Sequence, residues 1–92
     1  MKKIYCKVYN PLGLTSRVCA ELVAEANRAL NCTVTLYCDD DVADLKSIMN
    51  MMSLIIRTEQ EFTIEINGQN EEIVEEKFIA LLSQLKLLKQ EA

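Results

Sequence analysis

Apolar and polar residues alternate along three segments of the chain, 3–9, 32–38 and 62–66. This period of two is typical of strands that bury one face. A shorter strand is predicted at 42–43, directly after an acidic turn at 39–41. Because every predicted strand keeps one polar face, we expect an antiparallel sheet with one side in water.

Apolar residues also recur at helical spacing between the predicted strands. The first helix should begin at Ser16 as N-cap and end near Asn31, because serine and asparagine suit these positions. A second, short helix should begin at Ser47 and run to about Leu54. A third should start near Asn70, with Lys86 and Lys89 at its C-terminal end. The predicted buried positions of the two long helices are Cys19, Leu22, Val23, Ala26, Leu30, Val74, Phe78, Leu81, Leu82 and Leu85.

The resulting order is strand-helix-strand-strand-helix-strand-helix. It predicts an α+β fold, an open-faced β-sandwich in which helices cover one face of a four-stranded antiparallel sheet. At 92 residues, the chain 1–92 should form a single domain.

Composition narrows the possible functions. The net charge of −4 argues against direct binding to nucleic acid or to an anionic membrane. No apolar run approaches the ~18 residues of a membrane span. The basic start of the chain is not followed by the apolar stretch of a signal peptide, so we expect a cytoplasmic protein.

Site chemistry is narrowed further by the absence of histidine among the 92 residues. Histidine-based acid-base catalysis, histidine-ligated metals and phosphohistidine therefore have no side chain to use. The two glycines, Gly13 and Gly68, lie too far apart for a phosphate-binding loop. No convergent pair of carboxylates is evident, so we expect no enzyme, no metal and no cofactor.

The four cysteines show no C-x-x-C spacing. Each falls on an inward position of a predicted strand or helix, so we expect small, buried, reduced thiols. A disulfide or a reactive thiol is the alternative. The four are Cys6, Cys19, Cys32 and Cys38.

Two segments resemble those of HPr, the histidine-containing phosphocarrier family of the bacterial sugar phosphotransferase system. The segment 45–54, LKSIMNMMSL, is similar to the regulatory-serine segment of that family. The segment 13–19, GLTSRVC, falls where HPr carries Gly-Ile-His-Ala-Arg-Pro-Ala. The predicted order of elements and the segment 62–68 agree with this resemblance, which covers about the whole chain.

The same resemblance implies site residues and departures from the family pattern. Thr15 stands at the position of the phosphorylated histidine, and Val18 replaces the proline. Ser16 and Arg17 would form what remains of an anion site. Ser47 would be the site of regulatory phosphorylation. Asn50 replaces a glycine, and acidic residues at 39–41 and 44 replace a lysine-rich hairpin. The residues that would bind a partner are Lys46, Ile48, Met49 and Met52.

The function suggested by the resemblance is a regulatory or docking module in sugar transport and carbon catabolite control. Its partners would be an HPr kinase/phosphorylase-like enzyme and a LacI-type transcriptional regulator or other phosphotransferase proteins. The alternatives are a phosphocarrier paralogue in the ordinary sense, which lacks the needed imidazole, and a degenerate interaction protein with neither site in use. In that last case Ser47 is only a helix cap and the methionines only fill the core.

Overall fold

The computed structural model describes residues 1–90 of the chain. The elements follow one another in the predicted order. Their bounds are β1 (Lys2–Lys7), α1 (Ser16–Arg28), β2 (Cys32–Cys38), β3 (Asp41–Asp44), α2 (Ile48–Met52), β4 (Glu61–Gly68) and α3 (Glu71–Gln84).

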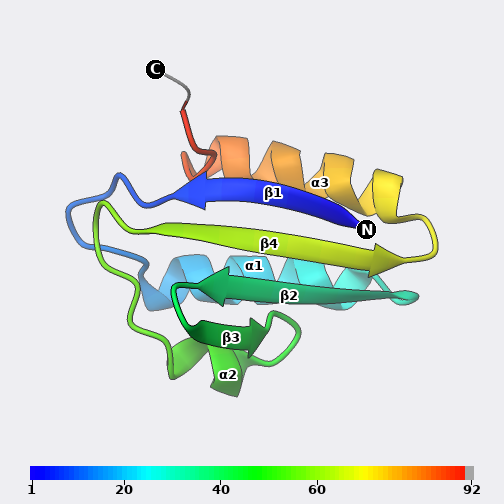
Figure 1. Cartoon of the computed structure of the whole chain (residues 1–92), viewed down its shortest axis with the longest axis horizontal. Helices are drawn as coiled ribbons and strands as arrows, with labels where there is room; N and C mark the ends of the chain where they lie inside the picture. The colour runs from blue at the N-terminus through cyan, green and yellow to red at the C-terminus, as the bar shows by residue number, and fades with distance from the viewer. Residues whose placement is uncertain (91–92) are drawn as a thin grey trace.

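The strands form one antiparallel sheet in the order β1-β4-β2-β3. Figure 1 looks onto the face of this sheet that no helix covers, and α1 and α3 lie behind it. The predicted α+β open-faced sandwich is therefore confirmed. In the described part of the chain, no helix is long and apolar enough to cross a membrane.

The core lies between the sheet and the helices. The strand residues that point into it are those that the alternation predicted. Burying one valine, leucine, isoleucine, phenylalanine or methionine side chain stabilises the fold by about 1.5–3 kcal/mol. Within residues 1–90, no polar or charged side chain is buried. The largest fully buried side chains are those of Phe78, Leu22, Leu36, Leu45, Met51, Ile64, Ile66, Leu82, Val8, Val34 and Cys6.

The ends of α1 differ from the prediction. Its N-cap is Thr15, and Ser16 is the first helical residue. Its C-cap is Ala29 rather than Asn31, so the helix stops before Leu30 completes the apolar stripe. Leu30 is consequently 84% exposed, and its assignment to the core was wrong.

The other boundaries shift by a few residues. β1 ends at Lys7 although Val8 beyond it is still fully buried, and β4 extends from Glu61 to Gly68. α2 ends at Met52, two residues earlier than expected. In α3 the predicted face points inward, with Phe78 and Leu82 buried. The remaining members of that face, Val74, Leu81 and Leu85, are partly buried against the core.

The chain after α3 forms a C-terminal strap, residues 86–90, along the outer edge of β1. Lys86 has φ 59° and turns the chain out of the helix. The amide of Lys7 then donates to the carbonyl of Leu87 at 2.9 Å, and the amide of Lys89 donates to the carbonyl of Tyr5 at 3.1 Å. Lys89 therefore does not lie at the end of α3 as predicted, because its backbone pairs with β1. The strap covers an edge that would otherwise offer unpaired backbone groups.

Candidate functional site

The N-terminus of α1 is the first candidate site. The Thr15 side chain accepts a hydrogen bond from the amide of Val18 at 3.4 Å, and its carbonyl accepts from the amide of Cys19 at 3.0 Å. Thr15 is half-buried. The sequence prediction assigned the cap to Ser16, one residue too late. The Thr15 hydroxyl therefore has a structural task, because it caps the helix.

The loop before Thr15 is held by close backbone contacts. The amide of Leu14 donates to the carbonyl of Ile56 at 2.9 Å. Gly13 has φ 75°, and a Cβ there would lie 2.9 Å from the same carbonyl oxygen. Only glycine meets both conditions without strain. The start of α1 is thus fixed against the segment that leads into β4.

Ser16 and Arg17 follow in the first turn of α1, and both are exposed. Within residues 1–90, the Arg17 guanidinium makes no hydrogen bond or ion pair, and the first turn contains no acidic residue. A guanidinium at the positive end of a helix is placed slightly unfavourably unless an anion joins it. The geometry is therefore compatible with the predicted anion site, which stays a prediction.

The four thiols are free and buried, as their inward phase predicted. Burial raises the pKa of Cys6 to about 12 and also raises the pKa of Cys19. Burial, followed by the charges of Asp39 and Asp41, raises the pKa of Cys38. Since the thiolate is the nucleophilic form, Cys19 is poorly suited to replace a missing histidine.

Ser47 at the start of α2 is the second candidate site. Its hydroxyl accepts from the amide of Asn50 at 3.2 Å, and its carbonyl accepts from the amide of Met51 at 3.1 Å. The predicted N-cap is confirmed. The side chain is half-buried, and its oxygen lies beside the free amides of the first helical turn.

Hydrogen bonds on both sides hold Ser47 in place. The amide of Ser47 donates to the carbonyl of Asp44 at 3.0 Å. The amide of Asp44 donates to the Asn50 side-chain oxygen at 3.3 Å. Asn50 therefore ties α2 back to β3.

Lys46 is turned away from solvent and toward α1. Its ammonium donates to the carbonyl of Ala29 at 2.6 Å, at the C-terminus of that helix. The Asn27 side-chain amide donates to the carbonyl of Lys46 at 3.0 Å. Lys46 thus links the Ser47 segment to α1, and its ammonium is occupied in that link.

The three apolar residues predicted to dock a partner are exposed beside Ser47. Ile48, Met49 and Met52 expose 39%, 77% and 46% of their surface, and we call them the docking patch. Met51 between them is 1% exposed, which confirms its predicted inward direction. An apolar surface with two flexible methionines suits adaptable protein contacts.

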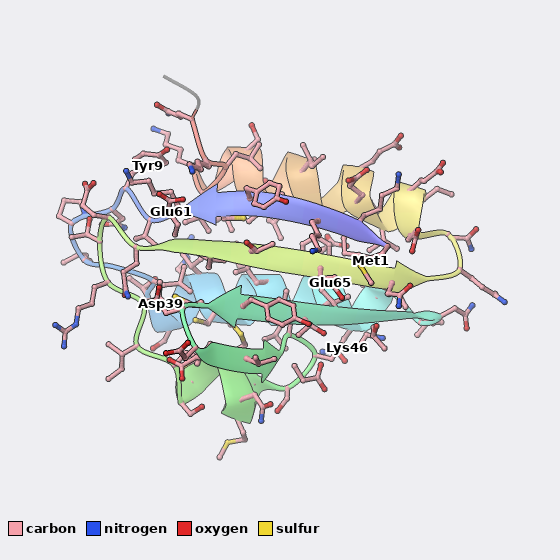
Figure 2. The ribbon with its side chains drawn as sticks, in the orientation of Figure 1. Met1, Tyr9, Asp39, Lys46, Glu61 and Glu65 are labelled. Atoms are coloured by element: carbon pink, nitrogen blue, oxygen red, sulfur yellow. The ribbon has the colours of Figure 1, made fainter. Side chains whose placement is uncertain are left out.

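The acidic residues do not all lie near Ser47. Asp39 and Lys46 are labelled at opposite ends of β3 in Figure 2. Asp39 turns toward Gln60, whose side-chain amide donates to it at 3.2 Å. At ~3.4 Å per residue, β3 separates its ends by about 10 Å, more than the ~8 Å screening length at physiological salt. Asp44 alone of the acidic residues at 39–41 and 44 is hydrogen-bonded to the Ser47 segment.

Sequence reasoning did not identify several contributors to these sites. Ile55, just after α2, and Leu12, in the loop before α1, are 77% and 81% exposed and line one pocket. Neither follows a clear period, so no pattern marked them as outward. Across residues 1–90, no group of three acidic or cysteine side chains could hold a metal ion.

Comparisons with known proteins identify the family. Residues 2–84 match the family described as PTS HPr component phosphorylation site. The phosphocarrier protein HPr of Lysinibacillus sphaericus is 30% identical over 87 residues, which cover 95% of this chain and 98% of that protein. The HPr-like protein Crh of Bacillus subtilis is 38% identical over 72 residues, covering 78% and 84%.

Solved structures show the same fold. The histidine-containing phosphocarrier protein of Mycoplasma superposes with a TM-score of 0.87 at 25% identity, over 97% of this chain and all of that one. The Crh structure of Bacillus subtilis superposes with a TM-score of 0.66 at 36% identity, over 85% and 88%. Proteins of this family carry phosphate and are not themselves enzymes. The chain belongs to the HPr family.

Proposed function

We propose that this HPr-family protein does not carry phosphate on histidine and acts as a regulatory or docking module of the phosphotransferase and carbon catabolite control network. The observation that carries the proposal is the contrast between its two helix starts. The first is capped by Thr15 and, in a chain without histidine, has no imidazole, whereas the second has an N-capping serine beside exposed apolar residues.

Thr15 is chemically unsuited to the carrier role. A histidine is nucleophilic at neutral pH, and its phosphoramidate passes the phosphoryl group on readily. A threonine hydroxyl has a far higher pKa and needs a base to activate it, and its phosphate ester is too stable to transfer. The Thr15 oxygen also accepts from the Val18 amide, so its removal or modification would disturb the α1 cap. Arg17 and Ser16 could still hold an anion that a partner presents.

Phosphorylation of Ser47 would switch this regulatory function. Transfer of the γ-phosphoryl group of ATP to its oxygen would release ADP and leave nearly two negative charges beside the first-turn amides of α2. The helix start would accommodate the phosphate with little refolding. The docking patch would then present apolar surface beside a new negative charge. A LacI-type transcriptional regulator or another phosphotransferase protein could recognise this combination. The modifying partner would be an HPr kinase/phosphorylase-like enzyme, and the location the cytoplasm.

Two other functions compete. A phosphocarrier paralogue would share the fold, yet the described sites offer it no imidazole. A degenerate interaction protein would use neither site, and Ser47 would then be a cap. Phosphate acceptance at Ser47 separates the proposal from the degenerate protein, and failure to accept phosphate through Enzyme I separates it from the phosphocarrier.

The test is incubation with an HPr kinase and ATP, followed by intact-mass measurement and peptide mapping. We expect one phosphate, on Ser47. Ser47→Ala should abolish it. Ser53→Ala is the matched control: Ser53 lies at the other end of α2, where its hydroxyl donates to the Asn50 carbonyl at 2.7 Å. Modification of Ser53, or of no residue, would contradict the proposed switch.

A further inference from the structure

The face of the sheet opposite the helices is uncovered, and the strand register arranges its side chains in two rows. One row runs across all four strands as Tyr5, Thr63, Tyr37 and Val42. The neighbouring row runs in the same strand order as Lys3, Glu65, Thr35 and Asp44. In Figure 1 these strands lie in front of α1 and α3.

Three of the four residues in the first row are large, hydrophobic and exposed, and the fourth, Thr63, is half-buried. Tyr5 is 61%, Tyr37 39% and Val42 63% exposed. The two tyrosines flank a cleft of about 380 Å³, lined by Lys3, Tyr5, Tyr37, Thr63 and Glu65. Contiguous exposed apolar surface with a polar rim is typical of a protein interface.

We propose that this face binds a second copy of the same chain, with the two sheets packed face to face about a two-fold axis. The reason is that its charges are complementary to themselves. Lys3 lies on the β1 side of the face, and Asp44 on the β3 side of the same row. A two-fold contact places Lys3 of each copy against Asp44 of the other copy, so the pair forms twice.

The register selects one position for the axis. An axis parallel to the strands and between β4 and β2 places β1 over β3 of the second copy. Lys3 then faces Asp44, Tyr5 faces Val42, and Tyr37 faces Thr63. Glu65 faces the neutral Thr35.

Other positions bring like charges together. An axis over β4 places Glu65 on Glu65, and an axis over β2 places Glu65 on Asp44. An axis across the strands places Lys3 near Lys7. Like charges facing each other across an interface are unfavourable. An axis between β1 and β4 avoids this clash but leaves Tyr37 and Val42 uncovered and meets the C-terminal strap.

The sheet edge offers less to a partner than the face does. The C-terminal strap already pairs with the outer edge of β1 through the bonds of Leu87 and Lys89. The other edge strand, β3, is only four residues long. Short or covered edges resist strand-to-strand addition.

The size of the face makes the dimer weak. Four strands at ~4.8 Å spacing and six residues at ~3.4 Å give a footprint of about 400 Å². Stable interfaces bury ~800 Å² per partner, so we expect reversible, concentration-dependent pairing.

Sedimentation equilibrium of the whole chain tests the proposal. The weight-average mass should rise from 10.5 kDa toward twice that value as concentration increases to about 1 mM, the range of weak interfaces. Tyr37→Ser should suppress the rise. Ile79→Ser is the matched control, because Ile79 on α3 is 40% exposed, like Tyr37, but lies on a helix on the other side of the sheet.

Charge exchange tests the register. Lys3→Glu and Asp44→Lys should each weaken pairing at least about tenfold, since each puts like charges together twice. An equimolar mixture of the two variants should pair again, because both contacts are then matched. Circular dichroism checks folding, since Asp44 also accepts from the Lys46 amide at 2.9 Å.

A mass that stays at 10.5 kDa throughout the series would overturn the proposal. So would a dimer that Tyr37→Ser, Lys3→Glu and Asp44→Lys all leave unchanged, which would mean that the copies meet elsewhere. Failure of the two folded charge variants to pair when mixed would also overturn it.

Discussion

Neighbouring methionines in α2 should respond very differently to truncation. Met51 is 1% exposed, whereas Met49, two positions earlier, is 77% exposed. Met51→Ala removes most of a buried side chain and leaves a cavity, which costs about 2–5 kcal/mol. Met49→Ala removes a side chain that already lies in water, so the change in unfolding free energy should stay within ~0.5 kcal/mol.

These magnitudes are measurable in a chain of 92 residues. One kcal/mol shifts Tm by about 4–8 °C in a domain of this size, so Met51→Ala should lower Tm by at least roughly 8 °C. Thermal and urea unfolding followed by circular dichroism give both values. If Met49→Ala cost several kcal/mol, Met49 would be core, and the docking patch would not exist. If Met51→Ala cost nothing, α2 would not bury the face that carries Met51.

Ser47→Ala should cost about 1 kcal/mol in urea unfolding, the contribution of one N-cap, and a loss of 3 kcal/mol would mean that the serine does more. At pH 8, thiol reagents should label the folded chain slowly, because burial raises the pKa of Cys6 to about 12; rapid labelling of two or more thiols would show that the strand phases are wrong. Reversing residues 39–41 to lysine should change the rate of Ser47 phosphorylation little, since that turn lies at the far end of β3; strong acceleration in a kinase assay would refute this. The hydrogen bond from Lys89 lowers the pKa of Glu61. The Glu61–Lys89 contact therefore stabilises the fold above the pKa that Glu61 has in the unfolded chain, and this stabilisation is lost as the pH falls through the lower pKa of Glu61 in the folded chain. Lys89→Met should raise the Glu61 pKa in an NMR titration.

The fold could be predicted because its periodicities are long and unmixed. Strand 32–38 alternates without a break, and its burial alternates in the same way. Helix ends were less predictable. Both Thr15 and Ser16 can cap a helix, and the contact that holds the chain just before them, from the Leu14 amide to the Ile56 carbonyl, is not visible in the sequence.

Contacts between distant segments could not be predicted from local patterns. The C-terminal strap depends on a positive φ at Lys86 and on pairing with β1, eighty residues earlier in the chain, and neither leaves a periodic signal. The same holds for Lys46, whose position on the Ala29 carbonyl appears only when α1 and the Ser47 segment meet. At the candidate sites, sequence reasoning predicted the Ser47 cap and the direction of Met51, whereas the structure supplied Asn50 as the tie to β3.

The most direct test of the central claim is phosphoryl transfer from phosphoenolpyruvate through Enzyme I, read as intact mass under conditions that preserve acid-labile phosphate. The account predicts no adduct on this chain, because none of its 92 residues is a histidine. Thr15→His should gain partial acceptance, since Arg17 and the α1 N-terminus remain in place. A stoichiometric, acid-labile phosphate on the unaltered chain would contradict the account.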